Sequence, residues 1–237
     1  MDDSTRGLYE ALEARARTVP EVIATMEAIA RCLDPADGVA CFNRLYLETT
    51  RQVGAALDAS RFEDAGFMER LDVVFAGLYF DALRRELAAR GTAPRAWDAL
   101  FEARARRPMH ALRFALAGMN AHINYDLARA LVRAAAELGG DVASDTPRHR
   151  DFLSINRVLA DTEATVKRTF VGGALATLDG AMGQVDDRTA IWSIARARDA
   201  AWTQGLVLWT LRGTALEGAY AATLDRSVGL VGRALLV

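Results

Sequence analysis

Cysteine and histidine are scarce in this sequence, and lysine is almost absent. Of the 237 residues, two are cysteines, Cys32 and Cys41, and three are histidines. Two cysteines are too few for a disulfide framework, which favours a reducing compartment. Three histidines argue against a multi-zinc site. Lys167 is the one lysine among 29 basic residues, a bias that we attribute to genome composition rather than to function.

The sequence also lacks a long apolar run and a strong net charge. No charge-free apolar stretch approaches the roughly 18 residues that a membrane-spanning helix needs. The formal net charge is −2, which gives no electrostatic reason to expect nucleic acid or an anionic membrane as a partner. Residues 1–17 are acidic and amphipathic, unlike a signal peptide. We therefore expect a cytoplasmic protein without a membrane span.

Apolar residues recur at helical spacing, and no alternating stretch bounded by turn residues predicts a strand. Because the connections are short and no linker or repeat stands out, we predict one all-α domain over residues 1–237, an array or bundle of about eight helices. The periodicity predicts helical segments over about 5–17, 20–32, 39–57, 65–90, 94–106, 109–137, 147–179, 187–211 and 214–236.

The stretch 109–137 is apolar on nearly every side, which is typical of a helix in the middle of a fold. It nevertheless contains a polar insert with Asn120, His122, Asn124 and Asp126. At 100° per residue, His122 and Asp126 share one face of the helix, and Asn120 and Asn124 share another. Buried polar groups cost free energy unless each has a partner, so this insert marks a candidate site.

A second acid occupies an apolar face in the helix predicted over 65–90. Asp72 shares that face with Phe75 and Tyr79, inside an aromatic and aliphatic stripe. A carboxylate in such a place must be hydrogen-bonded, paired, metal-bound or protonated. Asp72 is therefore the strongest sign that the polar groups do more than hold the fold together.

Two further helices supply polar and aromatic candidates. Asn43 and Tyr46 lie on one face of the helix predicted over 39–57, and Trp202 lies on a stripe of the helix predicted over 187–211. Tryptophans on such a stripe are more often packing residues than ligand contacts. We keep Trp202 as a candidate because its ring could contact an apolar substrate.

The first functional hypothesis is an enzyme that works by acid–base chemistry without a cofactor. His122, Asp126 and Asp72 would be catalytic, because an oriented imidazole and a buried carboxyl both exchange protons near pH 7. The substrate would be a small, largely apolar organic molecule, with a secondary metabolite as one candidate, and the reaction a cyclisation, isomerisation, elimination or hydrolysis. The residues expected to bind it are Asn120, Asn124, Tyr46, Tyr79, Asn43 and Trp202.

Two alternatives stay open at this point. In the first, a non-catalytic helical protein binds a ligand or a partner, and the polar cluster only fixes the register of the helices. In the second, a metal-dependent hydrolase uses a single divalent metal. His122 and Asp126 would then be ligands, because the i, i+4 spacing can place two side chains on one ion. Such a site needs one or two more ligands.

Four stretches resemble an uncharacterised, all-helical bacterial domain of unknown function. Together they span nearly the whole chain, which implies one domain. The resemblance implies no activity, but it places Asn43, Tyr46, Asp72, Asn120, His122, Asn124 and Asp126 inside family motifs. The matching stretches are DGVACFNRLYLETT (37–50), LDVVFAGLYFDAL (71–83), FALAGMNAHINYDLARAL (114–131) and the segment from IWSIARARDAAW to LDRSVGLVGRALL.

Overall fold

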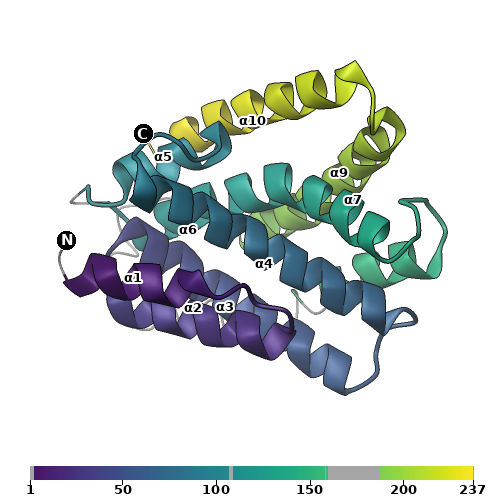
Figure 1. Cartoon of the computed structure of the whole chain (residues 1–237), viewed down its shortest axis with the longest axis horizontal. Coiled ribbons are helices and arrows are strands. Elements are labelled where there is room, and N and C mark those ends of the chain that lie inside the picture. The colour runs from purple at the N-terminus through teal and green to yellow at the C-terminus, as the bar shows by residue number, and fades with distance from the viewer. Residues whose placement is uncertain (1–2, 107–108, 158, 160–186, 237) are drawn as a thin grey trace.

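The computed structural model of the chain describes residues 3–106, 109–157, 159 and 187–236, and every regular element among them is helical (Figure 1). This confirms the all-α prediction. A helix over residues 147–157 lies between α7 and α9. The other elements, in chain order, are α1 (Asp3–Glu13), α2 (Val19–Cys32), α3 (Gly38–Asp58), α4 (Ala65–Ala88), α5 (Arg95–Ala103), α6 (Ala111–Ala121), η1 (His122–Asp126), α7 (Leu127–Glu137), α9 (Asp187–Leu211) and α10 (Ala215–Leu235).

Most helices lie close to their predicted positions because local side chains mark their starts. Asp37 accepts a hydrogen bond from the amide of Val39 at the start of α3, at 2.8 Å. Asp64 accepts one from the amide of Phe67 at the start of α4, at 2.9 Å. Such caps satisfy amide groups that have no partner inside the helix. Of the helix predicted over 147–179, most of the part after residue 157 lies outside the described residues.

The start of α5 is capped by a residue far away in the chain. Its N-cap residue, Pro94, has no side chain that can accept a hydrogen bond. The amides of Arg95 and Ala96 donate instead to the carboxylate of Asp225 in α10, at 3.2 and 2.9 Å. The position of α5 therefore depends on the docking of α10, which packs against it.

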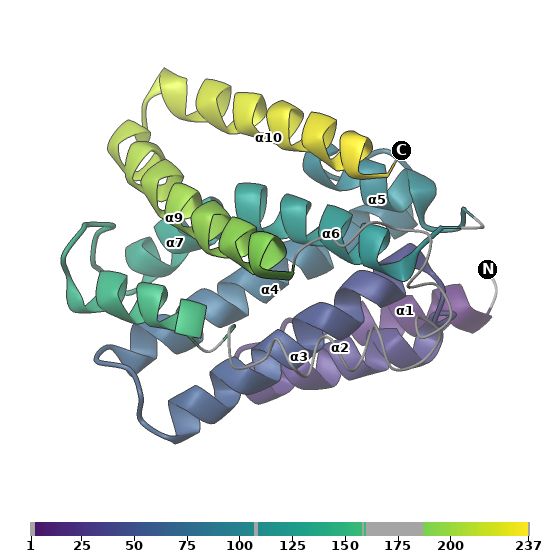
Figure 2. The same ribbon diagram turned by 180° about the vertical axis from the view of Figure 1, so that it is seen from behind.

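The segments α6, η1 and α7 follow one another through the middle of the fold, between the α1–α3 group and α10 (Figures 1 and 2). Seen from behind, α9 crosses this central rod (Figure 2), and it contacts both η1 and α7. The prediction that residues 109–137 lie in the middle of the protein is therefore confirmed. No described helix is long and apolar enough to cross a membrane.

The central rod is not the single α-helix that the periodicity predicts. Residues His122–Asp126 form a π-helical turn, in which the amide of Leu127 donates to the carbonyl of His122 five residues earlier. A π turn holds one extra residue, so it rotates the apolar face of α7 relative to that of α6. The rotation suits their neighbours, because α6 packs on α3, α5 and α10, whereas α7 packs on α4 and α9.

Two hydrophobic cores lie on either side of α4. One is built mainly from α1 to α6 and contains Trp97. The other is built mainly from α4, α7, α9 and residues 147–157, with a contribution from the end of α3, and contains Trp202. The side chain of Phe75 on α4 packs against both cores. Since Phe75 also stacks on His122, the candidate histidine lies near the boundary between the two cores.

Candidate functional site

His122 begins the π turn and is enclosed by aromatic rings, with 2% of its surface exposed. The ring of Phe75 lies parallel to the imidazole, with centroids 3.6 Å apart and an interplanar angle of 3°. The ring of Tyr46 meets it edge-on at 4.5 Å. These two rings come from α4 and α3 and cover the imidazole. The outer members of this aromatic cage are Phe42, Trp97 and Tyr79, with centroids at 5.7, 5.8 and 6.2 Å.

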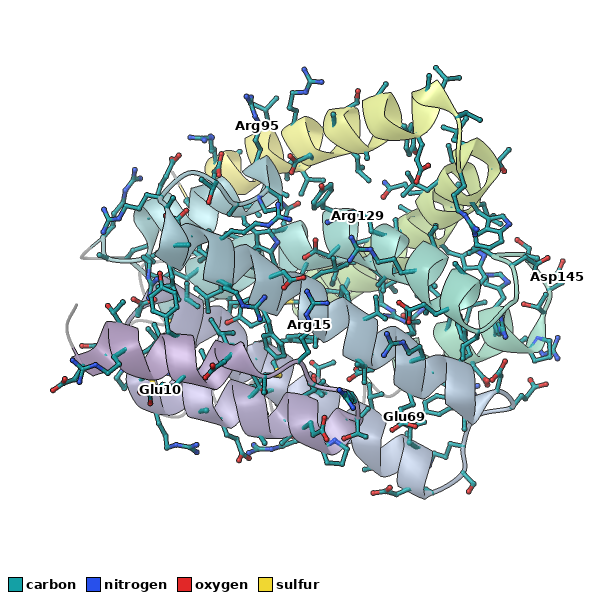
Figure 3. The ribbon with its side chains drawn as sticks, in the orientation of Figure 1. Glu10, Arg15, Glu69, Arg95, Arg129 and Asp145 are labelled. Carbon is teal, nitrogen blue, oxygen red and sulfur yellow. The ribbon has the colours of Figure 1, made fainter. Side chains whose placement is uncertain are left out.

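Asp126 sets the protonation of the His122 ring. Its Oδ2 lies 3.1 Å from Nδ1 of His122 and accepts a hydrogen bond from the indole of Trp97 at 3.0 Å. Its Oδ1 pairs with Arg129 at 3.3 Å; Arg129 is labelled in Figure 3. A carboxylate paired with arginine only accepts hydrogen bonds, so Nδ1 of His122 carries the hydrogen. This assigns the lone pair of the imidazole to Nε2.

Nε2 of His122 is buried without a hydrogen-bond partner, and two neighbouring groups share that condition. They are the hydroxyl of Tyr46 and Oδ2 of Asp72. The described part of the chain holds five buried side-chain atoms of this kind. Three of them belong to His122, to Tyr46, whose ring meets the imidazole, and to Asp72, whose charge acts on Tyr46. Asp72 lies one helical turn before Phe75, the ring that stacks on His122. Buried polar atoms are almost always paired in native proteins, so such a group calls for an explanation.

Burial moves the pKa values of these three groups in ways that suit proton transfer. It lowers the pKa of His122, although the hydrogen bond to Asp126 opposes that effect, so the imidazole is neutral. Burial raises the pKa of Asp72 to about 7, with a smaller contribution from the charge of Glu69. Burial, and then the charge of Asp72, raise the pKa of Tyr46 well above its ordinary value. Near neutral pH the group therefore combines a base, a titrating acid and a phenol donor.

The chain matches the model of a family described as "Family of unknown function (DUF5995)" over residues 19–237. It belongs to this family. The match covers every candidate residue and confirms the resemblance to a helical domain of unknown function. No curated protein and no solved structure matched the chain.

Two candidates in this DUF5995 chain, Asn43 and Tyr79, are hydrogen-bonded to each other, and Asn43 is also hydrogen-bonded to a neighbouring helix. The hydroxyl of Tyr79 donates to Oδ1 of Asn43 in a long hydrogen bond of 3.4 Å. Nδ2 of Asn43 donates to the carbonyl of Met26 at 2.9 Å. These bonds join α2, α3 and α4 behind the aromatic cage. Tyr79 borders His122 through its ring, whereas the amide of Asn43 is engaged by Met26 and Tyr79.

The remaining candidates lie away from His122. Nδ2 of Asn124 donates to Oδ1 of Asn120 at 3.1 Å, and Nδ2 of Asn120 donates to the carbonyl of Val228 in α10 at 3.0 Å. This agrees with the prediction that the asparagines occupy a different face from His122 and Asp126. Trp202 lies in the second core, so the structure does not bring it into the aromatic cage.

Two residues that contact Asp126 are absent from the set predicted from sequence. Arg129 could have been found, because it follows Asp126 at the i, i+3 spacing of helical ion pairs. Trp97 lies 29 residues before Asp126 on a separate helix, and no periodicity connects the two positions. Phe42 stacks on Tyr46 of its own helix, but its contacts with Tyr79 and Trp97 join separate helices that no periodicity connects.

The geometry assigns different roles to His122 and Asp126 if an ion binds here. Nδ1 of His122 faces Asp126, and both oxygens of Asp126 already accept hydrogen bonds from side chains. An ion would therefore bind Nε2, while Asp126 would orient the ring by accepting from Nδ1–H, as carboxylates beside metal-bound histidines do. Among the described residues, no group of three or more His, Cys, Asp or Glu side chains could hold a metal ion.

Proposed function

We propose that this chain is a bacterial, cytoplasmic enzyme that transfers protons on a small, largely apolar organic substrate. The observation that carries the proposal is the set of unpartnered atoms at His122, Tyr46 and Asp72. Each such atom costs a fold about 1–3 kcal/mol. A polar group of a bound substrate would remove that cost, because it could accept from Tyr46 and donate to Nε2.

His122 is the base of the proposed reaction. Its neutral ring presents the Nε2 lone pair, while Asp126 holds Nδ1–H and stabilises the imidazolium that forms when Nε2 takes a proton. Arg129 and Trp97 hold the carboxylate in place at 3.3 and 3.0 Å. This arrangement resembles the orienting role of the acid in a catalytic triad, with a substrate hydrogen as the proton source.

Asp72 is the acid of the proposed reaction. With a pKa of about 7, its carboxyl can hold and release a proton near neutral pH. Two groups whose pKa values are shifted in opposite directions are the usual pattern of a catalytic acid and base. The phenol of Tyr46, whose raised pKa keeps it protonated, would hold a substrate oxygen on which negative charge develops.

Isomerisation and cyclisation fit this site better than hydrolysis does. In an isomerisation, His122 removes one proton and Asp72 supplies one, so no co-reactant is needed. The enzyme returns to its starting state when the proton passes from His122 to Asp72. Hydrolysis needs a water molecule beside a ring that is 2% exposed and surrounded by aromatic walls. Because the imidazole is so enclosed, the substrate reaches Nε2 only when a wall moves.

Two other functions have an observation in their favour. The aromatic enclosure of His122 would also suit a protein that binds an apolar ligand without converting it. The position of Asp126 behind Nδ1 would suit a histidine that binds a single divalent metal in a hydrolase. Acid–base catalysis is the first choice because it gives each of the three unpartnered groups a role.

Deuterium transfer from solvent tests the proposal without knowledge of the substrate. Wild type, His122→Gln and His110→Asn are incubated in D2O with a bacterial metabolite extract and with apolar carbonyl compounds. Products are analysed by mass spectrometry. We expect wild type to introduce deuterium into at least one compound and His122→Gln to lose this activity. His110→Asn is the matched control, because His110 caps α6 by accepting from the amide of Leu112, a role that asparagine also fills.

The outcomes separate the three functions. Deuterium transfer that persists unchanged in His122→Gln would show that His122 is not the base. A compound that binds to wild type, but is neither deuterated nor converted, would favour ligand binding. Activity lost on chelation, together with near-stoichiometric metal that is absent from His122→Gln, would favour the metal-dependent hydrolase. Circular dichroism of each variant checks that the fold is intact.

A further inference from the structure

A buried arginine lies in the second core without an acidic partner. Arg198 on α9 is 7% exposed. Its Nε donates to Oδ1 of Asn156 at 2.9 Å, and Nη2 donates to the carbonyl of Phe152 at 2.7 Å. The guanidinium carbon lies 4.3 Å from the centroid of the Phe152 ring. Both acceptors are neutral, and no carboxylate of the described residues forms an ion pair with this guanidinium.

A buried cation of this kind needs a compensating negative charge. Burial lowers the pKa of Arg198 to about 10, against the opposing effect of Asp199, so the side chain still carries its charge at neutral pH. The acids nearby do not pair with the guanidinium. Asp199 is exposed, and Asp151 accepts hydrogen bonds from the amides of Glu63 and Asp64 at 2.9 and 2.7 Å. An uncompensated buried charge is strongly destabilising, so a functional reason is needed to retain it.

A buried donor without a partner lies one helical turn further along α9. Trp202 is 3% exposed, and its indole Nε1 is buried without a hydrogen-bond partner. Its ring centroid lies 4.9 Å from that of Phe152, the ring that also contacts Arg198. The ring of His149 stacks on the indole of Trp202, with centroids 4.5 Å apart. Nδ1 of His149 accepts a hydrogen bond from the amide of Asp145, which Figure 3 labels.

We propose that Arg198 and Trp202 bind the oxyanion of a small acid, a carboxylate or a phosphate group. Nη1 of Arg198, which no described residue engages, and Nε1 of Trp202 would both donate to it. A planar guanidinium and a neighbouring N–H suit the two oxygens of such a group. The anion would supply the charge that the core lacks. This site lies in the second core, outside the aromatic cage of His122, and does not depend on the proposed reaction.

Calorimetric titration tests the site. The protein is titrated with sodium acetate and, separately, with sodium phosphate, and sodium chloride at equal ionic strength is the reference. The proteins are wild type, Arg198→Gln, Trp202→Phe and Arg157→Gln. Arg157 is exposed on the helix over 147–157, so its substitution matches the change in charge outside the site. We expect binding to wild type and Arg157→Gln, loss of binding in Arg198→Gln, and affinity about tenfold weaker in Trp202→Phe, as for one charge-assisted hydrogen bond.

The indole N–H resonance of Trp202 gives a direct second readout, because a bound anion shifts it. Binding of acetate alone would identify a carboxylic acid as the ligand, and binding of phosphate alone would identify a phosphate ester; either result supports the site. Equal heats in all four proteins, or none in wild type, would overturn it. If Arg198→Gln does not fold, Trp202→Phe decides, since it keeps most of the packing and removes the donor. Wild-type affinity in that variant would overturn the proposal.

Discussion

The buried carboxyl of Asp72 should make the stability of this protein fall as pH rises, and Asp72→Asn should remove that effect. Burial raises the pKa of Asp72 from 3.8 to about 7 in the folded state. A folded-state pKa above the unfolded value means that the fold favours the protonated form. The destabilisation is therefore absent below pH 3.8, grows as pH rises towards about 7, and is constant at higher pH.

The magnitude follows from the difference between the two pKa values. They differ by about 3, from 3.8 to about 7, and one pKa unit corresponds to about 1.4 kcal/mol. Ionised Asp72 therefore costs about 4 kcal/mol at pH 8, a large part of the roughly 5–15 kcal/mol that stabilises a typical domain. An asparagine at this position stays neutral, but its buried amide group costs about 1–3 kcal/mol if it finds no acceptor. Asp72→Asn should thus be more stable than wild type at pH 8 by about 1–3 kcal/mol, and less stable at pH 4.

Urea denaturation followed by circular dichroism, repeated between pH 4 and pH 8, measures this difference. Between pH 4 and pH 8, we expect the free energy of unfolding of wild type to fall by about 4 kcal/mol more than that of Asp72→Asn. Burial of neutral His122 lowers stability as pH falls below 6.5, but both proteins contain His122, so its effect cancels in the comparison. Asp141→Asn, a change in an exposed acid, is the control and should follow wild type. A difference between wild type and Asp72→Asn that does not change with pH would refute the reasoning.

The remaining predictions concern one hydrogen bond of the aromatic cage and two glycines, and each is measured by urea denaturation at pH 7. Trp97→Phe removes the indole hydrogen bond of 3.0 Å to Asp126, and should lower the free energy of unfolding by about 1.5–3 kcal/mol; an unchanged value would show that Asp126 finds another donor. Gly118→Ala would place a Cβ 2.4 Å from a ring carbon of Phe42, and should destabilise the fold by about 1–3 kcal/mol. Gly77→Ala places its Cβ with no atom within 4 Å, and should stabilise α4 by about 0.5–1 kcal/mol. Similar effects of the two glycine substitutions would contradict the close approach at position 118.

The positions of the helices could be predicted from local patterns, with a few instructive exceptions. Capping residues such as Asp37 and Asp64 act on amides two or three residues away, so the starts of α3 and α4 are visible in the sequence. The π turn at His122–Asp126 is not visible in this way. It depends on the different neighbours of α6 and α7, and a 100° periodicity assumes that no such turn exists.

The candidate site was predictable only in part. His122 and Asp126 are four residues apart, so their contact follows from helix geometry, and the same rule indicates the contact between Asn120 and Asn124. The amphipathic face of α4 identified Asp72 as a buried acid, which the structure shows at 8% exposure. Periodicity within one helix says nothing about which helices meet. The sequence therefore could not indicate that Trp202 lies in the other core.

The sequence by itself determined the all-α class, the approximate positions of most described helices, and the buried polar pairs one turn apart. These features depend on contacts between residues close together in the chain, which backbone geometry sets. Only the tertiary structure decided that Tyr46 and Phe75 meet His122, that Trp97 holds Asp126, and that three polar atoms there lack partners. Those relations depend on how separate helices pack, and packing is chosen by the shape and burial of the whole core rather than by any local pattern.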